Sequence, residues 1–289
     1  MRSWRTSAPV NWARVTDVNA ELVSELVEAG LDRREARWLV EEFVPGGDLD
    51  AAPALRAAAK RRLNGEPLQY VLGHWPFRSL DLDVDSRALI PRPETEGLVD
   101  LALKELAASE VVAPLIVDLG CGSGAIGLSL LDELRQRGVA GTLVAVDESL
   151  EALALARRNA LKHRLHAVSF VQSSWFESLD SSLCSHVDLV VANPPYVSAD
   201  EFDTLDLVVH HEPLGALVSP DSRGVAGFDD VETIIRDAPA WLTPRGVLVL
   251  EHSDTHRDAA RAAALGAGFA DAEDFDDLAG QPRVLVARR

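Results

Sequence analysis

The sequence has few cysteines and no long apolar run. Its 289 residues include two cysteines, Cys121 and Cys184, too few for a disulfide framework or a four-thiolate zinc site. No stretch approaches the ~20 consecutive apolar residues that a membrane-spanning helix needs. The segment MRSWRTSAPVNWARV at the start contains no continuous apolar run of the kind found in secretory signals. We therefore expect a protein of the reducing cytoplasm.

The histidines do not resemble a metal site. The eight are scattered along the chain, and the adjacent pair His210 and His211 would not share one face of a helix. No local signature of a Ser/His/Asp arrangement occurs either. We expect neither a bound metal nor that kind of nucleophilic site.

Basic residues are scarce beyond the first third of the chain. The net charge is −18, but residues 1–92 hold 13 Lys and Arg against 14 Asp and Glu, whereas residues 93–289 hold 15 against 32. Because Lys and Arg supply most of the non-specific affinity for a phosphate backbone, this acidity disfavours a nucleic-acid substrate. The same charge also serves solubility, so it counts only modestly against such a substrate.

Three segments differ in their hydrophobic periodicity. Residues 1–68 contain three runs at helical spacing, which predicts a small helical domain. Within residues 69–92, Leu80, Leu82 and Val84 alternate with aspartates, which predicts a β-hairpin linker. Residues 93–289 alternate strands with helices, the pattern of an α/β fold with a mostly parallel sheet. Six strands are predicted there, over residues 114–118, 142–147, 168–171, 187–192, 246–251 and 283–287.

A glycine-rich loop follows the first of these strands and precedes a helix. Glycine lets a backbone turn sharply and approach a ligand closely, and a helix N-terminus offers free N–H groups. We expect this loop to bind a cofactor. Its residues are Asp118, Leu119, Gly120, Cys121, Gly122, Ser123 and Gly124.

Two cofactors suit this loop. Gly122 to Gly127 matches the G-x-G-x-x-G of a dinucleotide site, with Asp147 twenty residues further on. The second pattern is Asp-x-Gly-x-Gly-x-Gly over residues 118–124. In this pattern Asp118 ends the first strand and Asp147 ends the second, where a carboxylate can accept from ribose hydroxyls. Since Asp118 would repel a pyrophosphate but not a zwitterionic methionine group, this pattern favours S-adenosylmethionine.

A stiff tetrapeptide, Asn193-Pro194-Pro195-Tyr196, follows the fourth strand. Two prolines fix φ and restrict their neighbours, so the Asn193 side chain and the Pro194 carbonyl can be held in fixed positions. Both can accept hydrogen bonds from one planar NH2 group, and Tyr196 offers a flat face for stacking. Such a grip would aim the lone pair of a weakly nucleophilic nitrogen at a methyl donor, and alignment of this kind is worth several kcal/mol.

With these motifs the chain resembles the release-factor glutamine methyltransferases, the HemK/PrmC group. Gln69-Tyr-Val-Leu-Gly73 and Leu89-Ile-Pro-Arg-Pro-Glu-Thr-Glu96 look like segments of that family and are more specific than the glycine loop. The resemblance covers nearly the whole chain. It implies a helical domain over residues 1–68, a hairpin over 69–92, and a Rossmann-like class I methyltransferase domain with a seven-stranded sheet over 93–289.

The resemblance also implies an activity and a site. The activity is methyl transfer from S-adenosylmethionine to the N5 nitrogen of the glutamine in the Gly-Gly-Gln motif of class I peptide-chain release factors, with S-adenosylhomocysteine as the product. The helical domain would help to dock that partner, with the Arg56–Arg62 face as a candidate contact. Asn193 would touch both cofactor and substrate amide. The other implied roles are Gly120 to Gly124 lining the cofactor, Asp118 near its methionine end, Asp147 on its ribose, Trp175 against its adenine, and Asn193, Pro194, Pro195 and Tyr196 holding the glutamine.

The chain departs from the family pattern in three places. Ser174 stands where an aspartate usually contacts the adenine amine, Ala226-Gly-Phe228 replaces Asp-Gly-Leu, and Glu251-His-Ser253 replaces Glu-Ile-Gly. Four alternatives stay open: methylation of a ribosomal-protein glutamine, adenine-N6 methylation of a nucleic acid, an NAD-dependent oxidoreductase, and a binding module that keeps only the fold.

Overall fold

The computed structural model describes residues 12–221 and 224–289. The chain forms two compact units, one through Gly73 and the other from His74 to Arg289. The first eleven residues of the predicted helical domain lie outside the described residues.

The first unit is helical. It contains α1 (Trp12–Glu28), α2 (Arg33–Phe43), α3 (Ala52–Leu63) and α4 (Leu68–Leu72), with short 3-10 turns at Pro45–Gly47 and Leu49–Ala51. Asp32 caps α2 by accepting the Arg34 N–H at 2.7 Å, because the first N–H groups of a helix lack partners within it. The unit has its own core, which includes the fully buried Leu39 and Leu55.

The basic face of α3 is already paired with carboxylates of the same unit. Each of its three arginines contacts a glutamate, which compensates part of the positive charge of this face. The pairs are Arg56 with Glu25, Arg61 with Glu66, and Arg62 with Glu35.

The linker predicted over residues 69–92 is divided in the structure. Residues 68–72 form α4 within the first unit, and the helix ends at Gly73, whose φ of 82° suits a residue without a side chain. The predicted hairpin is formed by β1 (His74–Phe77) and β2 (Leu80–Asp83), which belong to the second unit.

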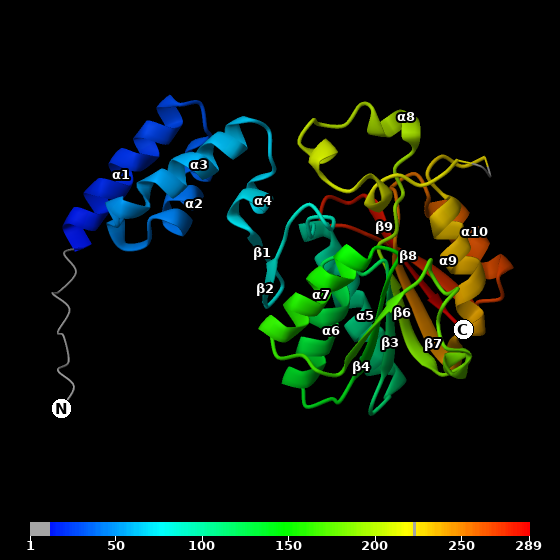
Figure 1. Cartoon of the computed structure of the whole chain (residues 1–289). Helices are drawn as coiled ribbons and strands as arrows, with labels where there is room; N and C mark the ends of the chain where they lie inside the picture. The colour runs from blue at the N-terminus through cyan, green and yellow to red at the C-terminus, as the bar shows by residue number, and fades with distance from the viewer. Residues whose placement is uncertain (1–11, 222–223) are drawn as a thin grey trace, which may run out of the picture. The chain divides into compact units, whose positions relative to one another are not determined.

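The second unit is built on a seven-stranded sheet, shown in Figure 1. Its order is β5-β4-β3-β6-β7-β9-β8, and β3 to β7 are parallel while β9 is antiparallel to β7 and β8. The six predicted strands are confirmed, and β8 is an additional strand at the edge. The bounds are β3 (Leu115–Leu119), β4 (Thr142–Asp147), β5 (Val168–Gln172), β6 (Val187–Ala192), β7 (Leu242–Glu251), β8 (Asp271–Asp276) and β9 (Pro282–Arg288).

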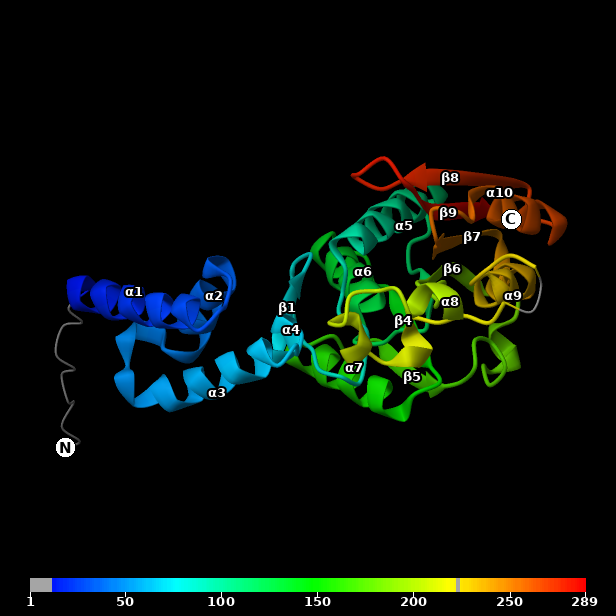
Figure 2. The same cartoon turned by 90° about the horizontal axis from the view of Figure 1, so that it is seen from above.

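Helices cover both faces of this sheet, as expected for a parallel sheet whose strands are buried on both sides. Figures 1 and 2 show α5, α6 and α7 on one face and α9 and α10 on the other. No helix among residues 12–221 and 224–289 is long and apolar enough to cross a membrane. The bounds are α5 (Glu96–Ser109), α6 (Ala125–Gln136), α7 (Leu150–Lys162), α9 (Asp229–Asp237) and α10 (Arg257–Gly266).

Between β6 and α9 the chain makes a long irregular excursion at the carboxyl end of the sheet. It contains α8 (Ala199–Phe202) and 3-10 turns at Val209–His211 and Leu214–Ala216. In Figure 1 this segment lies above the sheet. Carboxyl ends of parallel strands are where ligands bind in open α/β sheets, so the excursion helps to form a ligand site at this edge.

Candidate active site

A cavity of about 540 Å³ lies at the carboxyl ends of β3, β4 and β6. This volume is within the range of about 300–1,000 Å³ that is usual for small-molecule sites. Eight of the predicted site residues line the cavity: Gly120, Cys121, Gly122, Ser123, Asp147, Trp175, Asn193 and Pro195. The other four predicted residues, Asp118, Gly124, Pro194 and Tyr196, are not among the lining residues.

The glycine loop is shaped for close approach. Gly120, Gly122 and Gly124 have φ values of 69°, 54° and 84°, which side-chain-bearing residues rarely adopt. A Cβ on Gly120 would come within 3.3 Å of the Trp175 ring. Cys121 is buried, and burial raises the pKa of its thiol, so the residue serves packing rather than nucleophilic chemistry.

Asp118 is buried at the end of β3. Its Oδ2 accepts the Gly127 N–H at 2.9 Å, which ties the strand to the first turn of α6. Its Oδ1 has no hydrogen-bond partner among the described residues. The pKa of this carboxyl is raised to about 7, mainly by burial and to a smaller extent by nearby Asp147, while the Gly127 hydrogen bond opposes the rise.

Asp147, at the end of β4, holds the neighbouring backbone. Its Oδ2 accepts the Gly122 N–H and its Oδ1 accepts the Ser149 N–H, each at 2.9 Å. Burial raises the pKa of this carboxyl, and the two backbone hydrogen bonds oppose that effect. Each carboxylate oxygen can accept a second hydrogen bond, so acceptors remain for ribose hydroxyls.

Trp175 adopts a left-handed backbone conformation with φ of 45°, a strained conformation for an aromatic residue and one that is often found at functional sites. Its Nε1 donates to Asp230 Oδ1 at 3.1 Å, which fixes the ring beside the cavity. Ser174 and Asp230 also line the cavity here. No local motif in the sequence marks Asp230, which lies in the acidic first turn of α9.

The Asn193–Tyr196 loop faces the cavity with only some of its groups. Asn193 and Pro195 line it, and Asn193 Nδ2 donates to Thr95 Oγ1 at 3.3 Å. The Tyr196 hydroxyl instead donates to Glu251 Oε1 at 3.0 Å, and burial raises the pKa of this tyrosine. Tyr196 therefore anchors the loop to β7.

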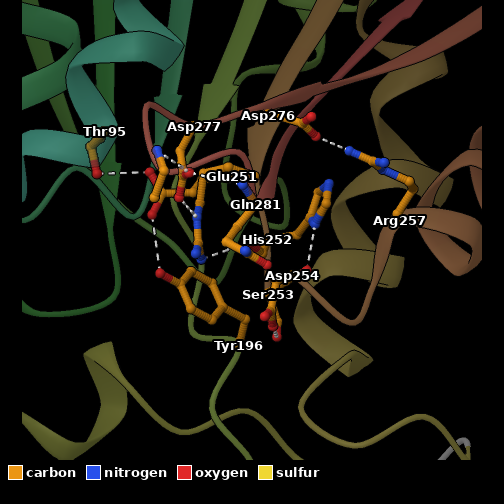
Figure 3. Close-up of polar contacts among 12 residues, drawn as sticks. Thr95, Tyr196, Glu251, His252, Ser253, Asp254, Arg257, Asp276, Asp277 and Gln281 are labelled. Atoms are coloured by element: carbon orange, nitrogen blue, oxygen red, sulfur yellow. Dashed lines mark hydrogen bonds and ion pairs between the residues drawn. The ribbon is translucent and has the colours of Figure 1, made fainter.

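Glu251 also accepts the Thr95 hydroxyl, through Oε2 at 2.7 Å. Figure 3 shows its carboxylate between the Thr95 and Tyr196 side chains. Burial raises the pKa of Glu251, while the two hydroxyls lower it. No sequence motif pairs Thr95 with Glu251, since 156 residues separate them and only the fold brings them together.

Two further buried side chains brace the cavity wall. Glu212 accepts the Ile90 N–H at 2.9 Å and contacts Arg92 at 2.5 Å. Asn159 bonds both backbone groups of Asp83 and donates to Ser123 O at 2.9 Å. These contacts connect the hairpin end and the segment after it to the glycine loop and to the excursion.

The cavity fits S-adenosylmethionine by its chemistry. The glycines leave room that a Cβ would fill, Asp118 has a buried oxygen without a partner among the described residues, and Asp147 has spare acceptors. A pyrophosphate would meet the carboxylates of Asp147, Glu148 and Asp230 in the lining, which disfavours a dinucleotide.

Comparison with known proteins agrees with this geometry. The model of the "Methyltransferase small domain" family matches residues 99–211. The chain is 37% identical to the release factor glutamine methyltransferase of Salmonella typhimurium, over 93% of this chain and 96% of that protein. It is 40% identical to that of Pseudomonas aeruginosa, over 93% of each. The match to the Pasteurella multocida protein, at 41%, spans 66% of this chain and 65% of that protein.

Solved structures share the fold of this chain. The hMettl16 catalytic domain, in complex with MAT2A 3′UTR hairpin 6, has a TM-score of 0.57 at 13% identity, covering 86% of this chain and 82% of that one. The T. thermophilus 16S rRNA N2 G1207 methyltransferase, with AdoMet and guanosine, has a TM-score of 0.51 at 18% identity, covering 75% and 49%.

Sheet topology, glycine loop and family match together define a class I methyltransferase that uses S-adenosylmethionine. Within that class, identity of 37–40% over nine-tenths of the chain decides the family. The chain belongs to the release factor glutamine methyltransferase family.

Proposed function

We propose that this protein transfers a methyl group from S-adenosylmethionine to the N5 nitrogen of the glutamine in the Gly-Gly-Gln motif of class I peptide-chain release factors. The observation that carries the proposal is the near full-length similarity to release factor glutamine methyltransferases, together with an Asn-Pro-Pro-Tyr loop that borders the cavity. A release factor as substrate also implies that this protein acts in the cytoplasm.

The roles of the site residues follow from their chemistry. Gly120 to Gly124 would lie along the cofactor, Asp147 would accept from its ribose hydroxyls, Trp175 would cover its adenine, and Asp118 would lie near its methionine end. S-adenosylmethionine supplies an electrophilic methyl group bonded to a sulfonium. Asn193 Oδ1 and the Pro194 carbonyl would accept the two N–H groups of the glutamine amide, which orients its nitrogen for attack.

The reaction needs no nucleophilic side chain. The amide nitrogen forms a bond to the methyl carbon as that carbon's bond to sulfur breaks, and S-adenosylhomocysteine keeps the electron pair of the broken bond. The nitrogen gives up one proton, which passes to solvent as the products leave. The protein therefore contributes orientation and exclusion of water during the transfer. The packed Pro194 and Pro195 keep the acceptors in place, because a proline ring fixes φ. The docking of the release factor is assigned to the helical first unit, with the Arg56–Arg62 face of α3 as a candidate contact.

The test is methyl transfer from labelled S-adenosylmethionine to a purified release factor, with the motif glutamine changed to alanine in a control substrate. We expect label in the first and none in the second. The variant Asn193→Ala should lose methyl transfer by at least about a hundredfold while it keeps its melting temperature and still binds the cofactor. Full activity of this variant would rule out the proposal that Asn193 holds the substrate amide by a hydrogen bond.

A ribosomal-protein glutamine and an adenine N6 amine present the same NH2 group, so both are included as competing substrates. The acidic second unit, with 18 Lys and Arg against 35 Asp and Glu over residues 74–289, disfavours the nucleic acid. Labelling of a ribosomal protein or of DNA in preference to the release factor would show that the release factor is not the substrate.

A further inference from the structure

The Asn193 carboxamide is the last member of a short hydrogen-bonded chain. Its Nδ2 lies 3.3 Å from Thr95 Oγ1, which lies 2.7 Å from Glu251 Oε2. The second carboxylate oxygen, Oε1, accepts the Tyr196 hydroxyl at 3.0 Å. Thr95 is 4% exposed and Glu251 is 1% exposed, so water has little access to these atoms. Figure 3 shows the hydrogen bonds of this series that involve Glu251.

The positions of the protons in this series of hydrogen bonds determine which end of the Asn193 carboxamide faces Thr95. A carboxylate only accepts hydrogen bonds, and a threonine hydroxyl has a single proton. Because Glu251 accepts both hydroxyls, the Thr95 proton is committed to it. Thr95 Oγ1 can then offer only lone pairs to Asn193, so the group that meets it must be the NH2. The carbonyl oxygen of Asn193 takes the opposite position on its planar carboxamide.

We propose that Thr95 and Glu251 are positioning residues that fix the direction of the Asn193 carboxamide, so that its carbonyl oxygen is the group presented to the substrate. This inference rests on the proposed function, in which Asn193 accepts from the glutamine NH2. A carboxamide turned by half a rotation would present NH2 to NH2, and two donors cannot bond each other.

Three separate elements supply the members of this chain. Thr95 ends the 3-10 turn Pro93–Thr95, Asn193 follows β6, and Glu251 ends β7. The backbone of Asn193 is restrained by the proline after it, but nothing in that restraint distinguishes the two ends of its carboxamide. The threonine and the carboxylate make that distinction.

The test compares Thr95→Val with Thr95→Ser. Valine matches threonine in shape but has no hydroxyl, whereas serine keeps it. We expect Thr95→Val to lower kcat for release-factor methylation roughly tenfold to a hundredfold, with KM for S-adenosylmethionine within about twofold. Thr95→Ser should stay close to the unmodified protein. Unchanged kcat in Thr95→Val, or equal losses in both variants, would overturn the proposal.

A second variant covers the case in which Thr95→Val does not fold. In Glu251→Leu no side-chain atom can accept a hydrogen bond, so neither hydroxyl keeps its partner. The threonine proton then turns to Asn193 Oδ1 and the carboxamide reverses. We expect a lower kcat with unchanged cofactor affinity, and an unchanged kcat would contradict the inference.

A readout independent of activity is the side-chain NH2 signal of Asn193 in a nitrogen-15 NMR spectrum, identified by its absence in Asn193→Ala. It should move in Thr95→Val and stay in place in Thr95→Ser. Failure of the unmodified protein to methylate any release factor would refute the proposed function, whereas an active protein whose Thr95→Val variant keeps full kcat and the same signal would refute only the positioning role.

Discussion

At the scale of single residues, Asp118 links the stability of the second unit to pH. Its pKa is raised to about 7 by burial, from an ordinary value near 3.8. Below about pH 4 the carboxyl is protonated in both the folded and the unfolded chain, so it does not make the free energy of unfolding depend on pH. Between about pH 4 and 7 the unfolded chain loses a proton that the folded chain keeps, so the free energy of unfolding falls as pH rises.

Removing this ionisation should flatten the pH dependence. In Asp118→Asn the carboxamide stays neutral and can still accept the Gly127 N–H. Without cofactor, the unmodified protein should lose about 2–3 kcal/mol more unfolding free energy than the variant between pH 5 and pH 8. Urea denaturation at both pH values measures this difference, with the exposed Asp203→Asn as control. Parallel pH profiles for Asp118→Asn and the unmodified protein would show that burial does not hold the proton.

Asp147 connects the loop geometry to cofactor affinity. Because its carboxylate bonds the Gly122 and Ser149 N–H groups, Asp147→Ala removes both the proposed ribose acceptor and the support of the loop. Hydrogen bonds to charged groups contribute about 1.5–3 kcal/mol, so we expect affinity for S-adenosylmethionine to fall roughly tenfold to a hundredfold. Titration calorimetry measures this, and a substitution of the exposed Asp271 on β8, Asp271→Ala, is the control. Unchanged affinity in Asp147→Ala would mean that the ribose binds elsewhere.

At the scale of elements, the last residues of the excursion before α9 support the Asn193–Tyr196 loop through one glycine. A Cβ on Gly227 would lie 2.3 Å from Tyr196 O and 3.2 Å from Ser198 N. These are backbone atoms that cannot move aside without shifting the loop. Gly268 also has a positive φ, but a Cβ there would meet no described atom within 4 Å.

Comparison of Gly227→Ala with Gly268→Ala separates the strain of a left-handed backbone from the effect of displacing the loop. Both substitutions strain a left-handed backbone, which costs about 1 kcal/mol, but only the first forces the loop to move. We expect Gly227→Ala to lower kcat at least about tenfold and Gly268→Ala to lower only the melting temperature. Equal kcat values for the two variants would show that the loop tolerates the displacement.

Sequence patterns predict the elements whose periodicity is local. The central strands read as apolar runs because helices bury both of their faces. The edge strand β8 escapes prediction since it reads Asp-Ala-Glu-Asp-Phe-Asp, with charges typical of a protected sheet edge. Its Asp274 is buried only because His252 and Arg257 pair with it. Likewise the glycine loop and Asn193 are local motifs, whereas the contact of Thr95 with Glu251 exists only in the folded chain.

At the scale of the whole molecule, the division at Gly73 assigns cofactor binding to one unit. Every residue that lines the cavity lies between Phe77 and Asp230, and each unit has a hydrophobic core of its own. A domain with its own core can fold alone. Residues 74–289 are therefore expected to fold and to bind S-adenosylmethionine without the helical unit.

That fragment should lose activity on the intact release factor but not on a peptide. If the helical unit docks the release factor, binding energy far from the reacting amide is removed with it. Methylation of the intact factor by residues 74–289 should then fall about tenfold or more, while methylation of a short Gly-Gly-Gln peptide and cofactor affinity stay within about twofold. A peptide substrate is the right control because it cannot use contacts outside the cavity. Equal losses on both substrates would place the defect in the active site and contradict docking by the first unit.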